Sequence, residues 1–385
     1  MSQPIRVVIV DDSALMRRVI AELLEQDSAI RVVGKARDGR EAIALVQELR
    51  PDIVTMDVRM PVMDGLATTE YLMAYCPTPI LVLTASLAKH DIDITFKMLG
   101  AGALEVIEKP SGGDPAELAR TGHELIRRIK ILSRVKVVTH LRGRRKLAGE
   151  TPTQRPAAAP QASRPASQRK LEPPTVPPAA PRSDPGFPIV VIGASTGGPR
   201  IVNQVLSGLK PDLGAAVLVV QHIAAGFSSG MAEWLAHACR LPVRMAREGQ
   251  PIRPGEVLIA PDQLDLLITP ECCVHLSGNP LLIQRPSIDI SMQAAAEVFG
   301  VRALGVLLTG MGRDGAYGML TIRRAGGYTI AQDEASSTIF GMPRAAIELN
   351  AACDVLPAAE IAARLMARLQ PDQRPALASS ARGGL

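Results

Sequence analysis

The stretch from residue 189 to residue 199 reads IVVIGASTGGP, four β-branched residues followed by a glycine-rich turn around Ser195. Such a run is typical of a buried strand that ends in a sharp turn before a helix. Gly193 and Gly198 are spaced as in a loop that cradles a dinucleotide, but Ser195 replaces the middle glycine and no convincing ribose-binding acid ends the next strand. The alternative interpretation is a GxSxG elbow, which exposes a serine hydroxyl as a nucleophile.

A serine nucleophile requires a base, and the base requires an orienting acid. Of the six histidines, only His222 closely follows a strongly apolar run, Val217–Val220. Asp314 follows another such run, Val306–Leu308. A single histidine near a core is more often structural. Together with Ser195 and Asp314, however, His222 favours a Ser195–His222–Asp314 triad at the carboxyl ends of parallel strands. The chain order Ser–His–Asp differs from that of ordinary α/β-hydrolases and predicts a different fold with convergent chemistry.

Short β-branched runs alternate with helical patterns along both halves of the chain. We expect strands at Ile5–Val10, Ile53–Met56, Ile80–Leu83, Leu104–Ile107, Ile189–Ile192, Ala216–Val220, Val257–Ile259 and Val306–Leu308. A helical stripe runs from Leu15 to Leu24, and Ser287 is expected to cap a helix whose buried face begins at Ile288. This alternation predicts two doubly wound α/β domains with sites at the carboxyl ends of their strands.

A proline-rich segment separates the two halves. Ten of the 31 prolines lie between Thr151 and Pro185, with almost no large apolar residue, so this segment is expected to be an extended linker. The predicted organisation is a first domain at residues 1–125, a basic and Pro/Ala-rich linker at 126–186, a second domain at 187–369 and a flexible tail at 370–385.

Composition limits the class of protein. The formal net charge is +5, and nine Lys or Arg with no acid lie between Arg127 and Lys146. This basic run favours a solvated helix end over a nucleic-acid contact, because no helix-turn-helix pattern follows the linker and only 3% of residues are aromatic. The five cysteines form no CxxC pair, and no apolar run reaches the length of a membrane span. We therefore expect a cytoplasmic protein with no nucleic-acid partner.

Polar residues follow the predicted strands of the first half. Asp11 and Asp12 follow the first strand, Asp57 and Thr84 follow the next two, and Lys109 follows the last. Three carboxylates at one sheet edge repel each other unless a divalent cation lies between them, and oxygen ligands suit Mg²⁺. Asp57 is then expected to act as the nucleophile toward a phosphoryl group, whose oxygens Lys109 and Thr84 hold. Helix capping by the acids alone does not explain the whole set.

These residues lie in motifs that resemble those of two-component response-regulator receivers over roughly residues 1–125. The motifs are Val10–Ser13, Met56–Gly65, Thr84–Ala85 and Lys109–Pro110. The resemblance implies a flavodoxin-like fold in which Asp57 takes a phosphoryl group from a histidine kinase. It also implies that Mg²⁺ is bound by Asp12, Asp57 and the carbonyl of Arg59, with Asp11 as outer support. Val106 stands where the family usually has an aromatic switch residue.

The whole chain resembles the family of chemotaxis protein-glutamate methylesterases, CheB. The matching catalytic motifs are Gly193–Gly198, Gln221–His222, Ile259–Pro261, Arg285–Asp289 and Leu308–Gly315. The resemblance implies a Rossmann-like catalytic domain with Ser195 as nucleophile, His222 as base, Asp314 as orienter and the backbone near Met311 in the oxyanion hole.

The implied reactions are hydrolysis of glutamyl γ-methyl esters on chemoreceptors and deamidation of receptor glutamines, activated by phosphorylation and with no cofactor for hydrolysis. The chain departs from the family at Ile223–Ala224, where Met-Pro is common, and at Asp262–Asp265, where Gly and His are common. Both positions border the substrate groove in the family.

Overall fold

The computed structural model describes residues 3–85, 89–110, 115–135, 137, 185–278 and 285–369. Most of the expected linker and the expected tail at 370–385 lie outside these residues. Within the described part of the chain, no helix is both long and apolar enough to cross a membrane.

The N-terminal domain is a five-stranded parallel sheet covered by helices on both faces. Its strands lie in the order β2-β1-β3-β4-β5. The elements are β1 (Ile5–Val10), α1 (Ala14–Leu24), β2 (Ile30–Ala36), α2 (Gly39–Leu49), β3 (Ile53–Asp57), α3 (Gly65–Tyr75), β4 (Ile80–Thr84), α4 (Lys89–Ala101), β5 (Glu105–Glu108) and α5 (Pro115–Leu132). Strands β3 and β4 are fully buried, which explains their continuous apolar sequences.

The C-terminal domain is built on a seven-stranded parallel sheet in the order β14-β13-β12-β6-β7-β9-β8. Its strands are β6 (Ile189–Ala194), β7 (Ala216–Gln221), β8 (Val243–Met245), β9 (Val257–Ile259), β12 (Ala303–Leu307), β13 (Tyr328–Gln332) and β14 (Asp354–Leu356), with a separate antiparallel pair, β10 (Asp265–Ile268) and β11 (Val274–Ser277). The helices are α7 (Gly198–Ser207), α8 (Ser228–Ala238), α9 (Ile288–Phe299), the 3-10 turn η1 (Gly300–Arg302), α10 (Ala316–Arg324), α11 (Met342–Glu348) and α12 (Ala358–Leu369).

The strand order reverses between β6 and β12, because the chain moves from β6 to β7 on one side and returns to β12 on the other. In open α/β sheets, sites form outside the carboxyl ends of the strands at such a reversal. The predicted residues Ser195 and Met311 lie just beyond the ends of these two strands.

The two doubly wound domains are as the sequence predicts, but one helix crosses an expected boundary. Helix α5 continues past residue 125 to Leu132. Leu125, Ile129 and Leu132 form a fully buried stripe, so this part of the basic run packs on the N-terminal core. Within it, Arg128 is paired with Glu124 on the same helix.

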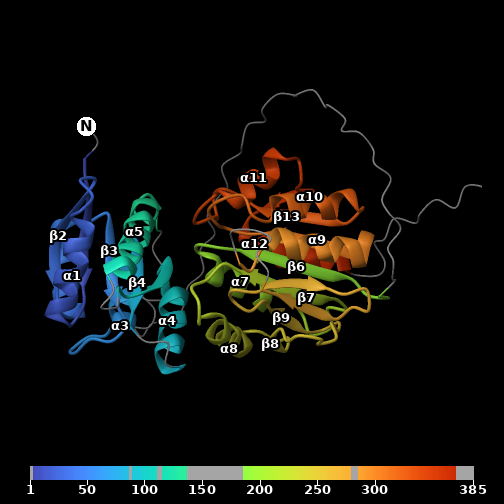
Figure 1. Ribbon diagram of the computed structural model, residues 1–385, viewed down its shortest axis with the longest axis horizontal. Helices are drawn as coiled ribbons and strands as arrows, with labels where there is room; N and C mark the ends of the chain where they lie inside the picture. Colours follow the sequence, from blue (N-terminus) through green and yellow to red (C-terminus); the bar gives the residue numbers. More distant parts are fainter. Residues whose placement is uncertain are drawn as a thin grey trace, which may run out of the picture.

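The two domains pack against each other through α4 on one side and α7 and α8 on the other (Figure 1). The rings of Phe96 and Trp234 stack with centroids 5.6 Å apart. Gly230 lets α8 approach α4, because a Cβ there would lie 1.8 Å from a methyl group of Ile92. The domains therefore meet through packed side chains.

Candidate functional site

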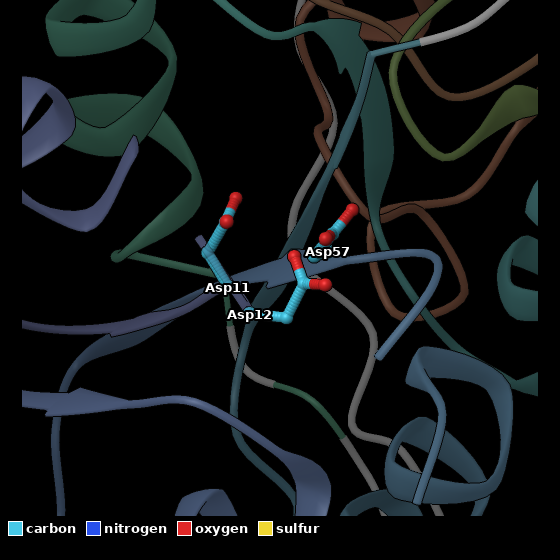
Figure 2. Close-up of side chains that lie close together, drawn as sticks. All are labelled: Asp11, Asp12 and Asp57. Atoms are coloured by element: carbon cyan, nitrogen blue, oxygen red, sulfur yellow. The ribbon is translucent and has the colours of Figure 1, made fainter. Parts of the chain in front are cut away.

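The three acidic residues of the N-terminal domain lie together at the carboxyl ends of β1 and β3 (Figure 2). Carboxylate oxygens of Asp11, Asp12 and Asp57 all lie within 4.8 Å of one another. Asp11 and Asp57 are buried, whereas Asp12 is exposed. A set of close carboxylates that opens to solvent on one side suits a hydrated Mg²⁺, which keeps several water ligands.

Lys109 neutralises the buried pair of carboxylates. Its Nζ lies 2.7 Å from Asp11 Oδ2 and 2.9 Å from Asp57 Oδ2. Burial by itself lowers the pKa of Lys109, but the bonds to Asp11 and Asp57 outweigh it and raise that pKa. Burial also raises the pKa of Asp57, against the lowering effect of Lys109. Thr84 is buried at the end of the neighbouring strand β4, as the sequence predicts.

Arg59 and Val106 also belong to the motifs of this domain. The side chain of Arg59 forms an ion pair with Asp91 on α4, while a metal-binding role for its carbonyl stays a prediction. Val106 is buried in the domain core, 4% exposed, so an aliphatic side chain occupies the position of the usual aromatic switch residue.

Ser195 lies one residue beyond β6, in the turn that leads into α7. Its backbone N–H donates to the carbonyl of Thr309 at 3.0 Å, and its own carbonyl accepts from Gln221 Nε2 at 2.8 Å. A Cβ at Gly310 would lie 2.7 Å from Ser195 Cβ, so the segment after β12 can pass this close only as glycine. The main chain on both sides thus fixes the serine.

His222 and Asp314 are joined directly. The Nε2 atom of His222 lies 2.8 Å from Asp314 Oδ2, and both side chains are 12% exposed. This bond leaves the other ring nitrogen, Nδ1, as the one available to a serine hydroxyl. No hydrogen bond joins Ser195 to His222 among the described residues, although both line one cavity.

Asp314 also lies at the N-terminus of α9. Its carboxylate accepts from the backbone N–H groups of Ile288 at 2.8 Å and Asp289 at 3.0 Å, and from Ser287 Oγ at 3.1 Å. Burial raises the pKa of Asp314, but His222 and the backbone donors outweigh it and lower the pKa below its usual value. The acid is therefore ionised and fixed in place at neutral pH.

Two backbone N–H groups beside Ser195 have no hydrogen-bond partner within the described ranges. They belong to Thr196, the residue after the serine, and to Met311, and both residues line the same cavity as Ser195. Unpaired N–H groups of residues that line the cavity of a nucleophile are suited to bind a developing oxyanion. The sequence does not indicate a role for the Thr196 N–H, because a main-chain donor does not require a particular type of side chain.

The cavity next to Ser195 has a volume of about 1050 Å³ and is lined by both domains. The C-terminal domain contributes Ser195, His222 and Arg285, and the N-terminal domain contributes Glu105 and Lys109. Ile223 and Ala224, which depart from the family pattern, also line it. Lys109, which is paired with Asp57, and Ser195 thus line the same cavity.

The N-terminal domain also touches the serine turn directly. The carbonyl of Leu104 accepts a hydrogen bond from Gly197 N–H at 3.2 Å, and Glu105 Oε2 accepts from Thr196 Oγ1 at 3.2 Å. Glu105 is in turn paired with Arg128. The start of β5 therefore covers the turn that carries Ser195.

Asp262, in the other departure from the family pattern, has a local structural role. It accepts from Ser228 Oγ at 2.6 Å and from the N–H of Gly226, at the start of α8. These bonds fix the segment that follows His222.

Two family models match the chain. The response regulator receiver domain matches residues 7–122, and CheB methylesterase matches residues 190–365. The protein-glutamate methylesterase/protein-glutamine glutaminase 2 of Anaeromyxobacter dehalogenans is 44% identical over 359 residues, which cover 93% of this chain and 95% of that protein. The corresponding protein of Symbiobacterium thermophilum is 40% identical over 366 residues, with 94% and 96% covered. The crystal structure of the Thermotoga maritima CheB methylesterase catalytic domain is 36% identical and covers 47% of this chain and 98% of that one, with a TM-score of 0.46.

Proposed function

Since the chain belongs to the protein-glutamate methylesterase/protein-glutamine glutaminase family, we propose that Ser195 is the nucleophile of an esterase and amidase acting on the side chains of receptor glutamyl residues. The observation that carries this proposal is the bond between His222 Nε2 and Asp314 Oδ2 at 2.8 Å, beside a cavity that also holds Ser195. The dinucleotide interpretation of the glycine turn has no such support.

In the proposed reaction, Ser195 Oγ attacks the γ-carbonyl carbon of a glutamyl methyl ester and gives its proton to His222 Nδ1. The oxyanion accepts hydrogen bonds from the N–H groups of Met311 and Thr196, which have no other partner among the described residues. His222 returns the proton to the leaving methanol, or to ammonia when the substrate is a glutamine. Water, activated by His222, then releases the glutamate from Ser195.

Asp314 orients His222 and stabilises its charged form without taking the proton. Its lowered pKa keeps it ionised through this cycle. No cofactor takes part in these steps.

The proposed regulatory reaction takes place at Asp57, which accepts a phosphoryl group from a histidine kinase. The close carboxylates of Asp11, Asp12 and Asp57 fit a divalent cation, and Mg²⁺ bound there supplies charge neutralisation for the incoming phosphoryl group. Lys109 and Thr84 would hold its oxygens, and the carbonyl of Arg59 would complete the metal site. Lys109 then exchanges its present partners for the phosphoryl group.

We further propose that the N-terminal domain restrains hydrolysis until Asp57 is phosphorylated. Leu104 and Glu105 bond to the turn after Ser195, and the domain closes one side of the cavity. A large methylated receptor cannot share that space. The phosphoryl group on Asp57 would bind Lys109, which lines the same cavity. This change weakens the packing of the N-terminal domain on the C-terminal domain.

The test is methanol release from radiomethylated receptor membranes. The purified protein should release labelled methanol, and Ser195→Ala should lower the rate on the order of a thousandfold or more while phosphorylation of Asp57 continues. Turnover like that of the wild type in Ser195→Ala would exclude the serine mechanism.

A further inference from the structure

Helices α9 and α10 begin next to each other, and each supplies an acceptor for the N-terminus of the other. Asp314, just before α10, accepts from the first-turn N–H groups of Ile288 and Asp289 on α9. In return, Asp289 Oδ1 accepts from the N–H of Gly318 in the first turn of α10 at 2.6 Å. Each of the two carboxylates thus accepts hydrogen bonds from the N-terminus of the other helix.

Helix α10 depends on this outside acceptor, because its own N-cap residue is Gly315, which has no side chain to accept a bond. The close approach of the two helices is also built into the sequence. A Cβ at Gly318 would lie 2.6 Å from Met292 Cβ and 3.0 Å from the carbonyl oxygen of Asp289. Asp289 reaches the Gly318 N–H because of that approach.

We propose that Asp289 is a positioning residue for the hydrolysis proposed above, on which this inference rests. By holding the first turn of α10 against α9, Asp289 fixes the segment before α10, which carries both Met311 and Asp314. It acts through these residues, since it is not among the residues that line the cavity and, within the described part of the chain, makes no hydrogen bond to His222.

The position requires an acceptor and not a charge. Asp289 is 8% exposed and its carboxylate lies near that of Asp314, and both effects disfavour its ionised form. An asparagine Oδ1 could accept from Gly318 N–H without repelling Asp314. Asp289→Asn therefore removes the charge and keeps an acceptor, whereas Asp289→Ala removes both. Comparing the two variants separates the positioning role from the charge.

The experiment measures methanol release by the full-length protein with Mg²⁺ and a small phosphodonor. Asp289→Ala should lower kcat by about 10- to 100-fold, because a small displacement of a catalytic group has effects of this order, and should leave KM within about twofold. Asp289→Asn should restore kcat to within about threefold of the wild type. A loss in Asp289→Asn as large as in Asp289→Ala would overturn the proposal.

A double variant shows whether Asp289 acts through Asp314. In the Asp314→Ala background, Asp289→Ala should lower kcat by a smaller factor than it does in the wild type, because one of the two groups that it positions is already absent and only the effect through Met311 is left. Multiplied losses would contradict the inference. If Asp289→Ala does not fold, Asp289→Glu replaces it, since one extra methylene group displaces the carboxylate and should also lower kcat about tenfold or more.

Glu256→Ala is a matched control, because it removes an acceptor from the Arg253 N–H at a turn of the same domain and should leave kcat unchanged. Full activity of Asp289→Ala would contradict only the positioning role. Retained activity of Ser195→Ala would instead contradict the proposed function, so the two failures are distinguishable.

Discussion

Asp314 bonds to His222 Nε2 at 2.8 Å with the same carboxylate that accepts the first two N–H groups of α9. The imidazole is thereby tied to the end of a helix that is itself buried in the domain core. The positive end of the helix dipole favours the ionised form of Asp314. The orientation of His222 therefore depends on a main-chain structure and not on a single side-chain pair.

Asp314→Asn should impair methanol release less completely than His222→Ala. The amide can accept the α9 N–H groups, but it no longer selects the imidazole tautomer that leaves Nδ1 free as a base. Losses in kcat on the order of 10⁴-fold for Asp314→Asn and 10⁶-fold for His222→Ala are expected for groups in these roles. Both variants should bind receptor membranes like the wild type. Full activity of Asp314→Asn at neutral pH would make Asp314 only a capping residue.

Glu105→Ala should raise the activity of the unphosphorylated full-length protein. It removes the acceptor for Thr196 Oγ1 and the partly buried carboxylate that is paired with Arg128 at the domain interface. A hydrogen bond to a charged group contributes about 1.5–3 kcal/mol, so the open population should increase roughly tenfold or more. The phosphorylated protein should change little, since its domains are already apart.

Glu124→Ala is the matched control for Glu105→Ala. Glu124 lies on α5, pairs with Arg128 and lines the same cavity, but it has no bond to the C-terminal domain among the described residues. Equal activation by both variants would show that Arg128, rather than the contact with Thr196, holds the domains together.

Asp289 should make the protein less stable as pH rises through its pKa. Burial and the nearby Asp314 raise the pKa of Asp289 from 3.8 to about 6, so the folded protein holds a proton there that the unfolded chain has released. Stability from this group is fully present below about pH 4 and decreases by about 1–3 kcal/mol up to about pH 6. Asp289→Asn should therefore raise the melting temperature at pH 7 but not at pH 4. An equal change at both pH values would contradict the assignment.

The parts of the fold that sequence predicts are those whose environment is uniform. Strands β3, β4, β6 and β7 are buried on both faces, so their apolar runs mark them plainly. Strand β2 is missed because much of it is partly exposed and its sequence includes Arg31, Gly34 and Lys35. Helix α5 extends beyond the expected domain boundary because Ile129 and Leu132 pack in the hydrophobic core of the N-terminal domain. The basic residues around them in the sequence do not indicate this packing.

The candidate site, too, can be predicted from the sequence only in part. Side chains at strand ends are visible in the sequence because chemistry requires their residue types. The roles of Asp289 and Thr196 are not visible, because one reads as an ordinary acid in a first helical turn and the other acts through its backbone. The first becomes apparent only when α9 and α10 are placed together, and the second only when the turn after Ser195 is placed at the cavity.

The most direct test of the account compares a fragment that starts near Gly186 with the full-length protein, using methanol release from radiomethylated receptor membranes. The fragment lacks Leu104 and Glu105, which cover the turn of Ser195, and should be active without any phosphodonor. The full-length protein should be slower until it receives Mg²⁺ and a small phosphodonor, and Asp57→Ala should remove that activation. Equal turnover by the fragment and by the unphosphorylated full-length protein would contradict restraint of Ser195 by the N-terminal domain.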